Sequence, residues 1–371
     1  MKITIAKTEF QQKLSDIQSV VEKKSTMPIL SHFLLKTSKS GSTITATDLE
    51  TAIREPITAE VAAEGALSVP ARKLFEIVRE VEGDIQIETE DSQWIRVKAG
   101  PASFRIACLP AEDYPLWPDM GSSEQIEVKA KELARMIEKT AYAAGESDTR
   151  YTLNGILFHL KPSERELTIV GTDGHRMAVI SMPLEGVSLS EEKKLIVQRK
   201  AATELGKFLE GAERVKMFLG KNHILFEVGD ILFLTRLIEG SYPNYGQVIP
   251  SGNEKKVSVS REAFIRALRR VSVMSRERSN AVRMDAGQDL LTLNSSNPDL
   301  GEAKDEVQAR YGGDPLSLGF NARYLIEALG AMEGENVTLE LQDPLSPTLL
   351  KPEGEPAGGG TYRCVIMPMR I

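Results

Sequence analysis

Arginine and lysine residues at helical spacing are the side chains of this sequence with the most suggestive chemistry. In several predicted helices they lie opposite the apolar stripe, so each helix has one basic and one buried face. Lysine and arginine bind nucleic-acid phosphates through their charge, without reading the base sequence. The residues on these faces are Arg72, Arg79, Lys131, Arg135, Lys139, Lys200, Lys207, Arg266, Arg269 and Arg270. Their grouping predicts a surface that follows a phosphate backbone.

The charge of the whole chain argues against a nucleic-acid partner, unless the charges are segregated. There are 46 lysines and arginines against 53 aspartates and glutamates, a formal net charge of −7. The acidic excess lies in predicted strands and loops, in residues 80–91, 299–306 and 333–343. Segregated charge makes a field that a uniform surface does not. The first predicted helix is less basic, because the corresponding face carries Gln12, Asp16, Ser19 and Lys23. That all these faces are ordinary solvated helix surfaces remains an alternative.

Side chains that could carry catalysis or bind a metal are scattered. Cys108 and Cys364 belong to no CxxC pair, and we expect both to be small buried hydrophobic residues. The histidines show no metal-ligand spacing, and neither a metal nor another cofactor is predicted; they are His32, His159, His175 and His223. No nucleotide-binding loop or nucleophile motif is found, and the glycine-rich stretch 354–360 precedes a strand. The pattern favours a binding protein over its two rivals, an enzyme and an interaction scaffold that never meets DNA.

Three segments of the chain share one pattern, and these must position the basic residues. Each begins with a short alternating strand and continues into a helix with an apolar stripe, from Lys2, Gln125 and Lys256. A second strand-to-helix unit recurs from residues 67, 194 and 316, and each of its helices ends near a glycine. The alternating stretches between them are typical of antiparallel strands. We predict an α+β fold of three domains, 1–122, 123–253 and 254–371, each with two helices on one side of a sheet.

Composition and length are typical of a folded, cytoplasmic protein. The 371 residues suffice for two or three domains, and 41% are apolar while 27% are charged. No apolar run approaches the roughly 18 residues that span a membrane, and the N-terminus has no export signal. Proline-containing stretches at 114–117 and 242–245 predict extended connectors between domains. We expect a cytoplasmic protein without a membrane partner.

Several motifs follow one another along the whole chain. They are Pro28-Ile29-Leu30, Thr47-Asp48-Leu49-Glu50, Val69-Pro70-Ala71-Arg72-Lys73, Tyr151-Thr152-Leu153-Asn154-Gly155, Thr172-Asp173-Gly174-His175-Arg176 and Val365-Ile366-Met367-Pro368-Met369-Arg370-Ile371. Together they resemble the bacterial DNA sliding clamps, the β subunits of the replicative DNA polymerase III holoenzyme. The resemblance implies three clamp domains in a head-to-tail homodimer, a ring with sheets outside and helices lining a hole. Such a ring encloses duplex DNA without sequence specificity. It tethers the replicative polymerase, the clamp loader and other proteins with clamp-binding motifs, confers processivity and catalyses no reaction.

The resemblance also implies which residues meet DNA and which join two chains. Phosphate contacts would come from Lys24, Arg72, Lys73, Arg150, Tyr151, Arg199 and Lys200. Near the subunit interface would lie Phe104 and Ile106 of the first domain and Val273 and Met274 of the third. The stretch Gly145-Glu146-Ser147-Asp148 departs from the family, because two acids stand where relatives often carry polar or basic residues. We expect them to weaken a DNA contact there.

A groove for partner peptides is implied between the second and third domains. Its residues would be Leu153, Thr172, Gly174, His175, Arg176, Met177, Pro243, Val248, Leu345, Pro347, Ile366, Met367, Pro368, Met369 and Arg370. Methionines are adaptable and can receive different partners. Polar anchors at the edge would be Arg176, Arg370 and the terminal carboxylate. Two alternatives remain open, since His175 could be a structural turn residue and the two terminal methionines could be simple core packing.

Overall fold

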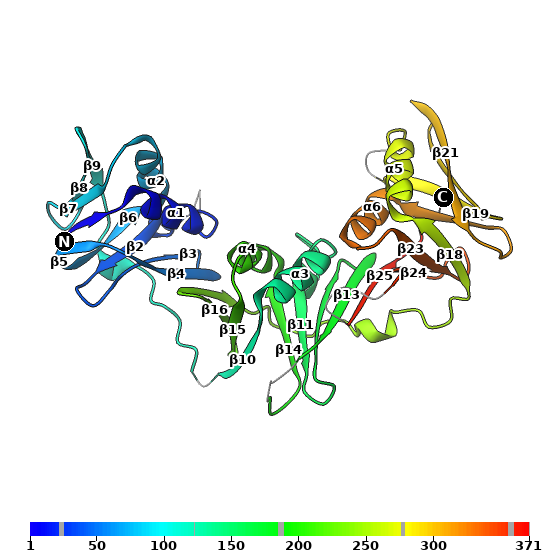
Figure 1. Ribbon diagram of the computed structural model, residues 1–371, viewed down its shortest axis with the longest axis horizontal. Helices are drawn as coiled ribbons and strands as arrows, with labels where there is room; N and C mark the ends of the chain where they lie inside the picture. Colours follow the sequence, from blue (N-terminus) through cyan, green and yellow to red (C-terminus); the bar gives the residue numbers. More distant parts are fainter. Residues whose placement is uncertain (22–25, 122, 185–188, 276–278, 355–359, 371) are drawn as a thin grey trace. The chain divides into compact units, whose positions relative to one another are not determined.

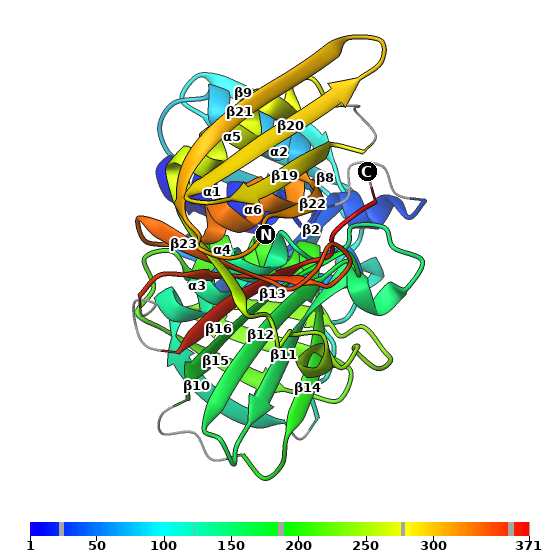
Figure 2. The same cartoon turned by 90° about the vertical axis from the view of Figure 1, so that its right-hand side faces the viewer.

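The computed structural model describes residues 1–21, 26–121, 123–184, 189–275, 279–354 and 360–370. Within these ranges the chain forms six α helices, α1 to α6, and the strands β1 to β25 (Figures 1 and 2). Four short 3-10 helices are also present there, at Pro28–Ser31, Ala111–Asp113, Tyr151–Asn154 and Tyr245–Gln247. Two compact units emerge, one of residues 1–130 with 208–236 and the other of residues 131–207 with 237–371.

The first compact unit places α1 (Lys7–Ile17) and α2 (Ala71–Glu80) side by side against two sheets (Figure 1). The sheets have the orders β5-β1-β7-β8-β9 and β10-β15-β16-β17-β4-β3-β2-β6. The apolar stripe predicted for the first helix, Phe10, Leu14, Ile17 and Val21, is buried in the core between them. The strands are β1 (Lys2–Ile5), β2 (His32–Thr37), β3 (Ser42–Thr47), β4 (Thr51–Ile57), β5 (Glu60–Ala63), β6 (Gly65–Pro70), β7 (Ile85–Thr89), β8 (Trp94–Ala99), β9 (Ala102–Ala107), β10 (Glu124–Lys129), β15 (Arg214–Leu219), β16 (His223–Val228) and β17 (Ile231–Arg236).

The second compact unit contains most of α3 (Ala130–Ala141) and α4 (Arg199–Leu209), with α5 (Arg261–Ser272) and α6 (Ala322–Ala331). Its single twelve-stranded sheet has the order β14-β11-β12-β13-β25-β24-β23-β18-β21-β20-β19-β22, and Figure 2 shows the long β20–β21 hairpin. The predicted stripes of α3 and α5 are buried, Leu133, Ile137, Thr140 and Ala144 in one and Phe264, Leu268 and Val271 in the other. The strands are β11 (Gly155–Lys161), β12 (Glu166–Thr172), β13 (Arg176–Pro183), β14 (Lys193–Gln198), β18 (Lys255–Ser260), β19 (Ala281–Gly287), β20 (Leu290–Asn297), β21 (Gly301–Arg310), β22 (Leu316–Asn321), β23 (Asn336–Leu341), β24 (Thr348–Pro352) and β25 (Thr361–Ile366).

The helix ends of the second strand-to-helix unit repeat closely. After α2, α4 and α6 the chain turns at Gly83, Gly211 and Gly334, whose φ angles are +79°, +79° and +93°. Glycine adopts this left-handed conformation without the strain of a side chain, which is why it ends helices. The predicted helix stops are therefore confirmed, and the three repeats share backbone detail as well as element order.

Neighbouring repeats are joined by antiparallel strands in one register. The last strand of the second repeat, β17, pairs with β4 of the first, with Phe233 opposite Ile53. The last strand of the third repeat, β25, pairs with β13 of the second, with Cys364 opposite Ala178. The second repeat thus shares a sheet with each neighbour, which explains why the division into two compact units falls inside it.

The two cysteines are buried, Cys108 with 5% and Cys364 with 1% of its surface exposed, as predicted. Burial raises the pKa of the Cys108 thiol to about 12. In the part of the chain that the structure describes, no helix is long and apolar enough to cross a membrane.

Candidate functional site

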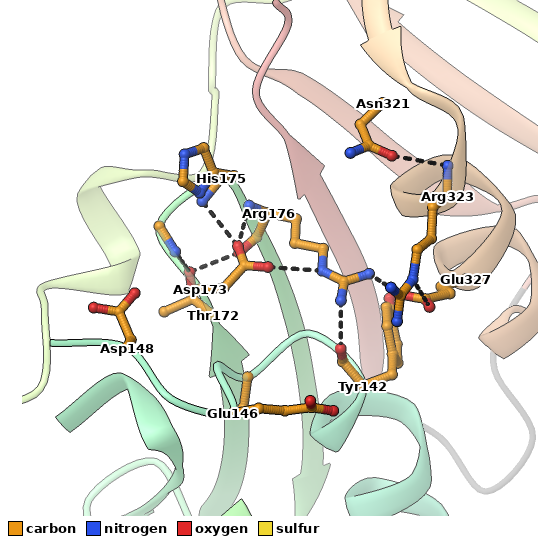
Figure 3. A network of polar contacts seen from close by, with 12 residues as sticks. Tyr142, Glu146, Asp148, Thr172, Asp173, His175, Arg176, Asn321, Arg323 and Glu327 are labelled. Atoms are coloured by element: carbon orange, nitrogen blue, oxygen red, sulfur yellow. Dashed lines mark hydrogen bonds and ion pairs between the residues drawn. The ribbon is translucent and has the colours of Figure 1, made fainter. Parts of the chain in front are cut away.

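The turn between β12 and β13 is closed by its own side chains. The Thr172 hydroxyl donates to the carbonyl of Arg176 at 2.6 Å and accepts from the N–H of Gly174 at 3.1 Å. Asp173 Oδ1 accepts from the N–H groups of His175 and Arg176, at 2.9 and 3.0 Å (Figure 3). Gly174 has a φ of +84°, and a Cβ there would lie 2.6 Å from Nη1 of Arg150. A side chain at this position would therefore displace the Arg150 guanidinium.

A cavity of about 170 Å³ lies beside this turn. Its lining is mostly apolar with a few polar groups, as is typical of ligand sites. The lining residues are Arg150, Leu153, Thr172, Gly174, His175, Arg176, Met177, Pro243, Tyr245, Val248, Val365 and Met367. The Met367 N–H donates to the carbonyl of His175 at 2.9 Å, so the chain after β25 continues along β13 and forms one wall. The structure thus brings together, around one cavity, most of the predicted groove residues from β12, β13 and the connector at 242–245.

The aromatic part of this wall is held from behind. The Tyr245 hydroxyl is 2.7 Å from Nδ1 of His159, and Nε2 of His159 is 2.6 Å from Glu192. His159 is buried, and burial lowers its pKa although the hydrogen bond to Glu192 acts in the opposite direction. A second connector tyrosine, Tyr242, donates its hydroxyl to the carbonyl of Val170 at 3.2 Å. These bonds fix the connector against the sheet, so the cavity has a preformed wall.

Arg176 is not the free polar anchor that the sequence predicted. Only 8% of its surface is exposed. Its guanidinium binds Asp173 Oδ2 at 3.1 Å, the carbonyl of Tyr142 at 2.7 Å and the carboxylate of Glu327 (Figure 3). It also lies over the ring of Tyr324, 4.5 Å from the centroid. Arg176 therefore joins the β12–β13 turn to α6, and it also lines the cavity.

Arg150, which the resemblance assigned to DNA, lines the cavity. Its guanidinium binds both carboxylate oxygens of Asp148, at 2.9 and 2.7 Å, and donates to the carbonyl of Asp173 at 2.9 Å. The hydrogen bonds from Arg150 lower the pKa of Asp148 to about 2. The unusual acid of the 145–148 stretch thus holds Arg150 at the rim of the cavity.

The remaining predicted groove residues do not line this cavity. Ile366 is fully buried in the ladder opposite Arg176, and the N–H of Met369 donates to the carbonyl of Gly319 at 2.8 Å. The carbonyl of Pro347 accepts from Asn253 at 2.9 Å, and Leu345 is exposed. Pro368 and Arg370 are not among the residues that line the cavity, and Ile371 with its carboxylate is outside the described residues. A place for these residues in a longer peptide groove beyond this cavity stays a prediction.

Two of the predicted basic-face residues are not exposed. The Lys139 side chain is only 5% exposed, and its Nζ lies 2.8 Å from the carbonyl of Ala331 and 3.0 Å from Glu333. Arg135 binds both oxygens of Glu333, at 3.2 and 3.4 Å. The prediction that both project from a basic layer is wrong, since the end of α6 covers this side of α3. Residue spacing along a helix identifies the face that points away from the sheet, but it cannot show that a second helix covers that face.

The other predicted DNA-contact residues differ in how free their charges are. Arg199 donates to the carbonyl of Ala144 at 2.9 Å and lies 3.1 Å from Glu146, the other acid of the unusual stretch. Arg72 and Lys73 share Glu76, at 3.1 and 2.7 Å, and Tyr151 is 77% exposed. Lys24 lies outside the described residues. Exposed positions are held by Lys131, Lys200, Arg266, Arg269 and Arg270.

Two of the predicted interface residues lie on an edge strand, and the other two follow helix α5. Ile106 and Phe104 are on β9, the last strand of its sheet, where Ile106 is buried and Phe104 packs partly against the core. Val273 follows α5 and is exposed. A Cβ built on Gly301, the first residue of β21, would lie 3.4 Å from Cε of Met274. Met274 therefore lies at the beginning of β21.

Three cavity residues were not included in the predicted groove, Arg150, Tyr245 and Val365. Tyr245 and Val365 belong to stretches that the sequence had singled out, the second connector and the C-terminal motif. Proximity to those motifs was the available signal. Arg150 directly precedes the Tyr151–Gly155 motif, but its contacts with Asp148 and the carbonyl of Asp173 could not be read from the sequence.

Comparison with known proteins gives a consistent match along the chain. Three family models match in order: the N-terminal domain of the DNA polymerase III beta subunit at residues 1–118, its central domain at 127–244 and its C-terminal domain at 246–370. The chain is 34% identical to a beta sliding clamp of Caulobacter vibrioides and 35% identical to one of Pseudomonas putida, with 100% of both chains covered in each case. It is also similar to a crystal structure of a sliding clamp from Pseudomonas aeruginosa bound to griselimycin, with a TM-score of 0.93, 33% identity and 100% of both chains covered.

Proposed function

The chain belongs to the family of DNA polymerase III beta subunits, the beta sliding clamps, and we propose that it encircles duplex DNA and tethers replication proteins to it. The resemblance seen in the sequence motifs and the α+β fold of three clamp domains are thereby confirmed. The observation that carries the function is the match of three consecutive clamp-domain models to one chain with a preformed apolar cavity. The domain boundaries near 122 and 253 are part of this proposal.

Partner proteins bind the cavity beside the Thr172–Arg176 turn through a short peptide. Its apolar anchors replace a wet apolar surface with a dry one, and Met177 and Met367 adapt to different anchors. Arg150 and His175 stand at the rim, where a peptide's polar groups would lie. The partners proposed are replicative polymerase subunits, the clamp loader and other proteins that share a clamp-binding motif.

Two chains close a head-to-tail ring through strands β9 and β21. In the described part of the chain, β9 ends its sheet, and only the last two residues of β21 pair with β18. Exposed strand edges of this kind pair readily with another chain. In the ring, β9 of one chain would take the place of β17, and β21 of the other chain would take the place of β4. If the register of β17 with β4 is repeated, Phe104 of one chain lies opposite Ala303 of the other, and Arg105 lies opposite Glu302. The same register brings Ile106 opposite Gly301, beside Met274, which supports the interface implied by the resemblance.

DNA is held by enclosure and by weak phosphate contacts. The basic residues that are exposed, such as Lys131, Lys200 and Arg269, supply charge without a means of reading bases. Glu146 and Asp148 reduce the charge that Arg199 and Arg150 can offer. We propose no covalent chemistry and a cytoplasmic location, since the protein acts on cellular DNA. Assays for nuclease activity with Mg²⁺ and Mn²⁺ should show none.

Topology provides the decisive test of this function. The protein, loaded onto nicked circular DNA by its clamp loader, should remain bound for much longer than on the same DNA after linearisation. Direct binding without loading should be weak and should fall steeply as salt rises, as expected of phosphate contacts. Equal lifetimes on circular and linear DNA would remove the support for enclosure.

A further inference from the structure

In the contact between α3 and the end of α6, two basic side chains of α3 form the basic half, and a carboxylate and a backbone carbonyl at the end of α6 form the acidic half. Lys139 donates to the carbonyl of Ala331 at 2.8 Å and lies 3.0 Å from Glu333. Arg135, one turn earlier in α3, binds both oxygens of Glu333. These contacts join the second and third repeats, whose strands β13 and β25 also pair with each other. A strand junction between repeats is therefore reinforced by ion pairs on its helical side.

The basic half of this arrangement recurs in the third repeat. Aligning the buried residues of α5 with those of α3 puts Phe264 at the position of Leu133 and Leu268 at that of Ile137. Arg266 then stands at the position of Arg135, and Arg270 at that of Lys139. The side chains of Arg266 and Arg270 are exposed, at 62% and 60%. Their ion pairs are to Glu262 and Asp305 of their own repeat, and among the described residues neither pairs with the end of a second helix as Arg135 and Lys139 do.

The acidic half recurs in the first repeat. Aligning α2 with α6 puts Glu82 at the position of Glu333 and the carbonyl of Glu80 at that of Ala331. The backbone agrees closely, since the residues after the two helices, Val81 and Met332, are both extended. The next glycines, Gly83 and Gly334, have φ angles of +79° and +93°. Glu82 is exposed.

We infer that Arg270 and Arg266 of one chain bind Glu82 and the carbonyl of Glu80 of a second copy of the chain, and so lock the ring. This inference rests on the proposed head-to-tail dimer. Helix α5 packs against β21, of which only the last two residues pair with β18, and α2 precedes the edge strand β9 in the chain. Arginine has several N–H donors, so Arg270 can keep its bond from Nε to Asp305, at 2.6 Å, while its other nitrogens bind the partner chain.

The first repeat shows that this basic pair is a specific feature. On α1 the corresponding positions carry Gln12 and Asp16, which bond to each other at 2.8 Å. The basic pair is therefore present in α3 and α5 and absent from α1. Arg266 and Arg270 were grouped with the DNA-facing residues by their helical position, and this inference assigns them to ring closure instead. Arg269, between them, remains available for DNA.

A charge-reversal experiment with two single variants tests the pairing. Arg270→Glu and Glu82→Arg should each weaken dimerisation by at least about tenfold in sedimentation velocity, because each places like charges at both interfaces. An equimolar mixture of the two variants should form a heterodimer of near wild-type stability, since one interface keeps Arg270 with Glu82 and the other carries the reversed pair. Arg269→Glu is the matched control and should dimerise as the wild type does.

The outcomes separate this inference from the proposed ring. Wild-type dimerisation of both single variants, or failure of the mixture to associate, would overturn the ion pair while the dimer stands. A wild-type protein that is monomeric at every concentration would overturn the dimer itself. The neutral variants Arg270→Gln and Glu82→Gln, with circular dichroism as a check of folding, give the same comparison if a reversed charge unfolds the chain. In that case, equal affinity of the neutral variants and the wild type would overturn the pair.

Discussion

Two turns of the chain, at Thr47-Asp48-Leu49 and at Thr172-Asp173-Gly174, have the same hydrogen bonds beside cavities of different size. Thr47 repeats the bonds of Thr172, donating to the carbonyl of Thr51 at 2.9 Å and accepting from the N–H of Leu49 at 3.0 Å. Asp48 accepts from the N–H groups of Glu50 and Thr51, as Asp173 accepts from the two equivalent N–H groups. The third residue has a positive φ in both turns, +74° at Leu49 and +84° at Gly174. The cavities measure about 50 and 170 Å³.

The two cavities differ in size because different side chains stand on the same backbone conformation. Leu49 and Trp117 line the smaller cavity, at positions where the larger one has Gly174 and Tyr245. Arg54 covers the Trp117 ring, 4.3 Å from its centroid. Leu49 also adopts a left-handed conformation that is unfavourable for a residue with a Cβ by about 1–2 kcal/mol. The repeated turn thus supplies a place for a pocket, and glycine together with a smaller aromatic residue leaves it open.

Converting the second turn into a copy of the first should have the largest effect. Gly174→Leu should fill the cavity and displace Arg150, so the affinity for a clamp-binding-motif peptide should fall roughly 100-fold, about 3 kcal/mol, as for loss of a central pocket. Isothermal titration measures this. Gly211→Leu is the matched control, because Gly211 has a φ of +79° with open space around it. Unchanged affinity in Gly174→Leu would show that this cavity is not the peptide site.

The strands after the two turns differ in one buried charge, and this predicts a pH dependence. Glu55 on β4 occupies the position that Ile180 has on β13. Burial raises the pKa of Glu55 from 4.5 to about 7, although its hydrogen bond with Lys13 acts in the opposite direction.

In the unfolded chain Glu55 loses its proton at lower pH than in the folded chain, so rising pH favours unfolding in this window. The free energy of unfolding of the first compact unit should fall by up to about 3 kcal/mol between these two pKa values and change little above them. Glu55→Gln should remove most of this slope in urea unfolding measured at pH 5 and pH 8. An identical slope in the variant would assign the dependence to other groups.

A smaller effect is expected from shortening the wall of the larger cavity. Met367→Ala removes an adaptable side chain that is 39% exposed, and it should weaken peptide binding about tenfold, or ~1.4 kcal/mol. Leu116→Ala, in the connector beside the smaller cavity, should leave the affinity unchanged, because Leu116 is 93% exposed. Sedimentation should show that both variants remain dimers. Equal losses in the two variants would remove the distinction between the cavities.

The smallest effect is expected from relieving the strained turn. Leu49→Gly removes the left-handed strain but also loses partly buried apolar surface and makes the unfolded chain more flexible. These contributions oppose each other, and the free energy of unfolding should stay within about 1 kcal/mol of the wild-type value. Thermal unfolding measures it. A large loss of stability would mean that Leu49 packs more tightly than its 50% exposure indicates.

Local patterns in the sequence were enough for the repeats, the helices and the family. The apolar stripes of α1, α3 and α5 are buried as predicted, because burial of one helix face follows from spacing alone. The stops at Gly83, Gly211 and Gly334 follow from the conformational freedom of glycine. The motif at 172–176 was open to reading as a turn, whose hydrogen bonds join residues close in sequence. The pocket beside it was implied by the family resemblance.

Which polar side chains are free to bind something else depends on contacts between distant elements. Arg135 and Lys139 are taken by Glu333, Arg176 by Glu327, and Arg150 by Asp148 and a backbone carbonyl. Three of these partners lie far along the chain or reach across an element boundary, so spacing along one helix or strand cannot reveal them. A long charged side chain binds whichever opposite charge the fold brings within reach, and desolvation makes that pairing necessary once the site is covered. The sequence determined where charges stand on each element, whereas packing between elements determined which of them remain exposed.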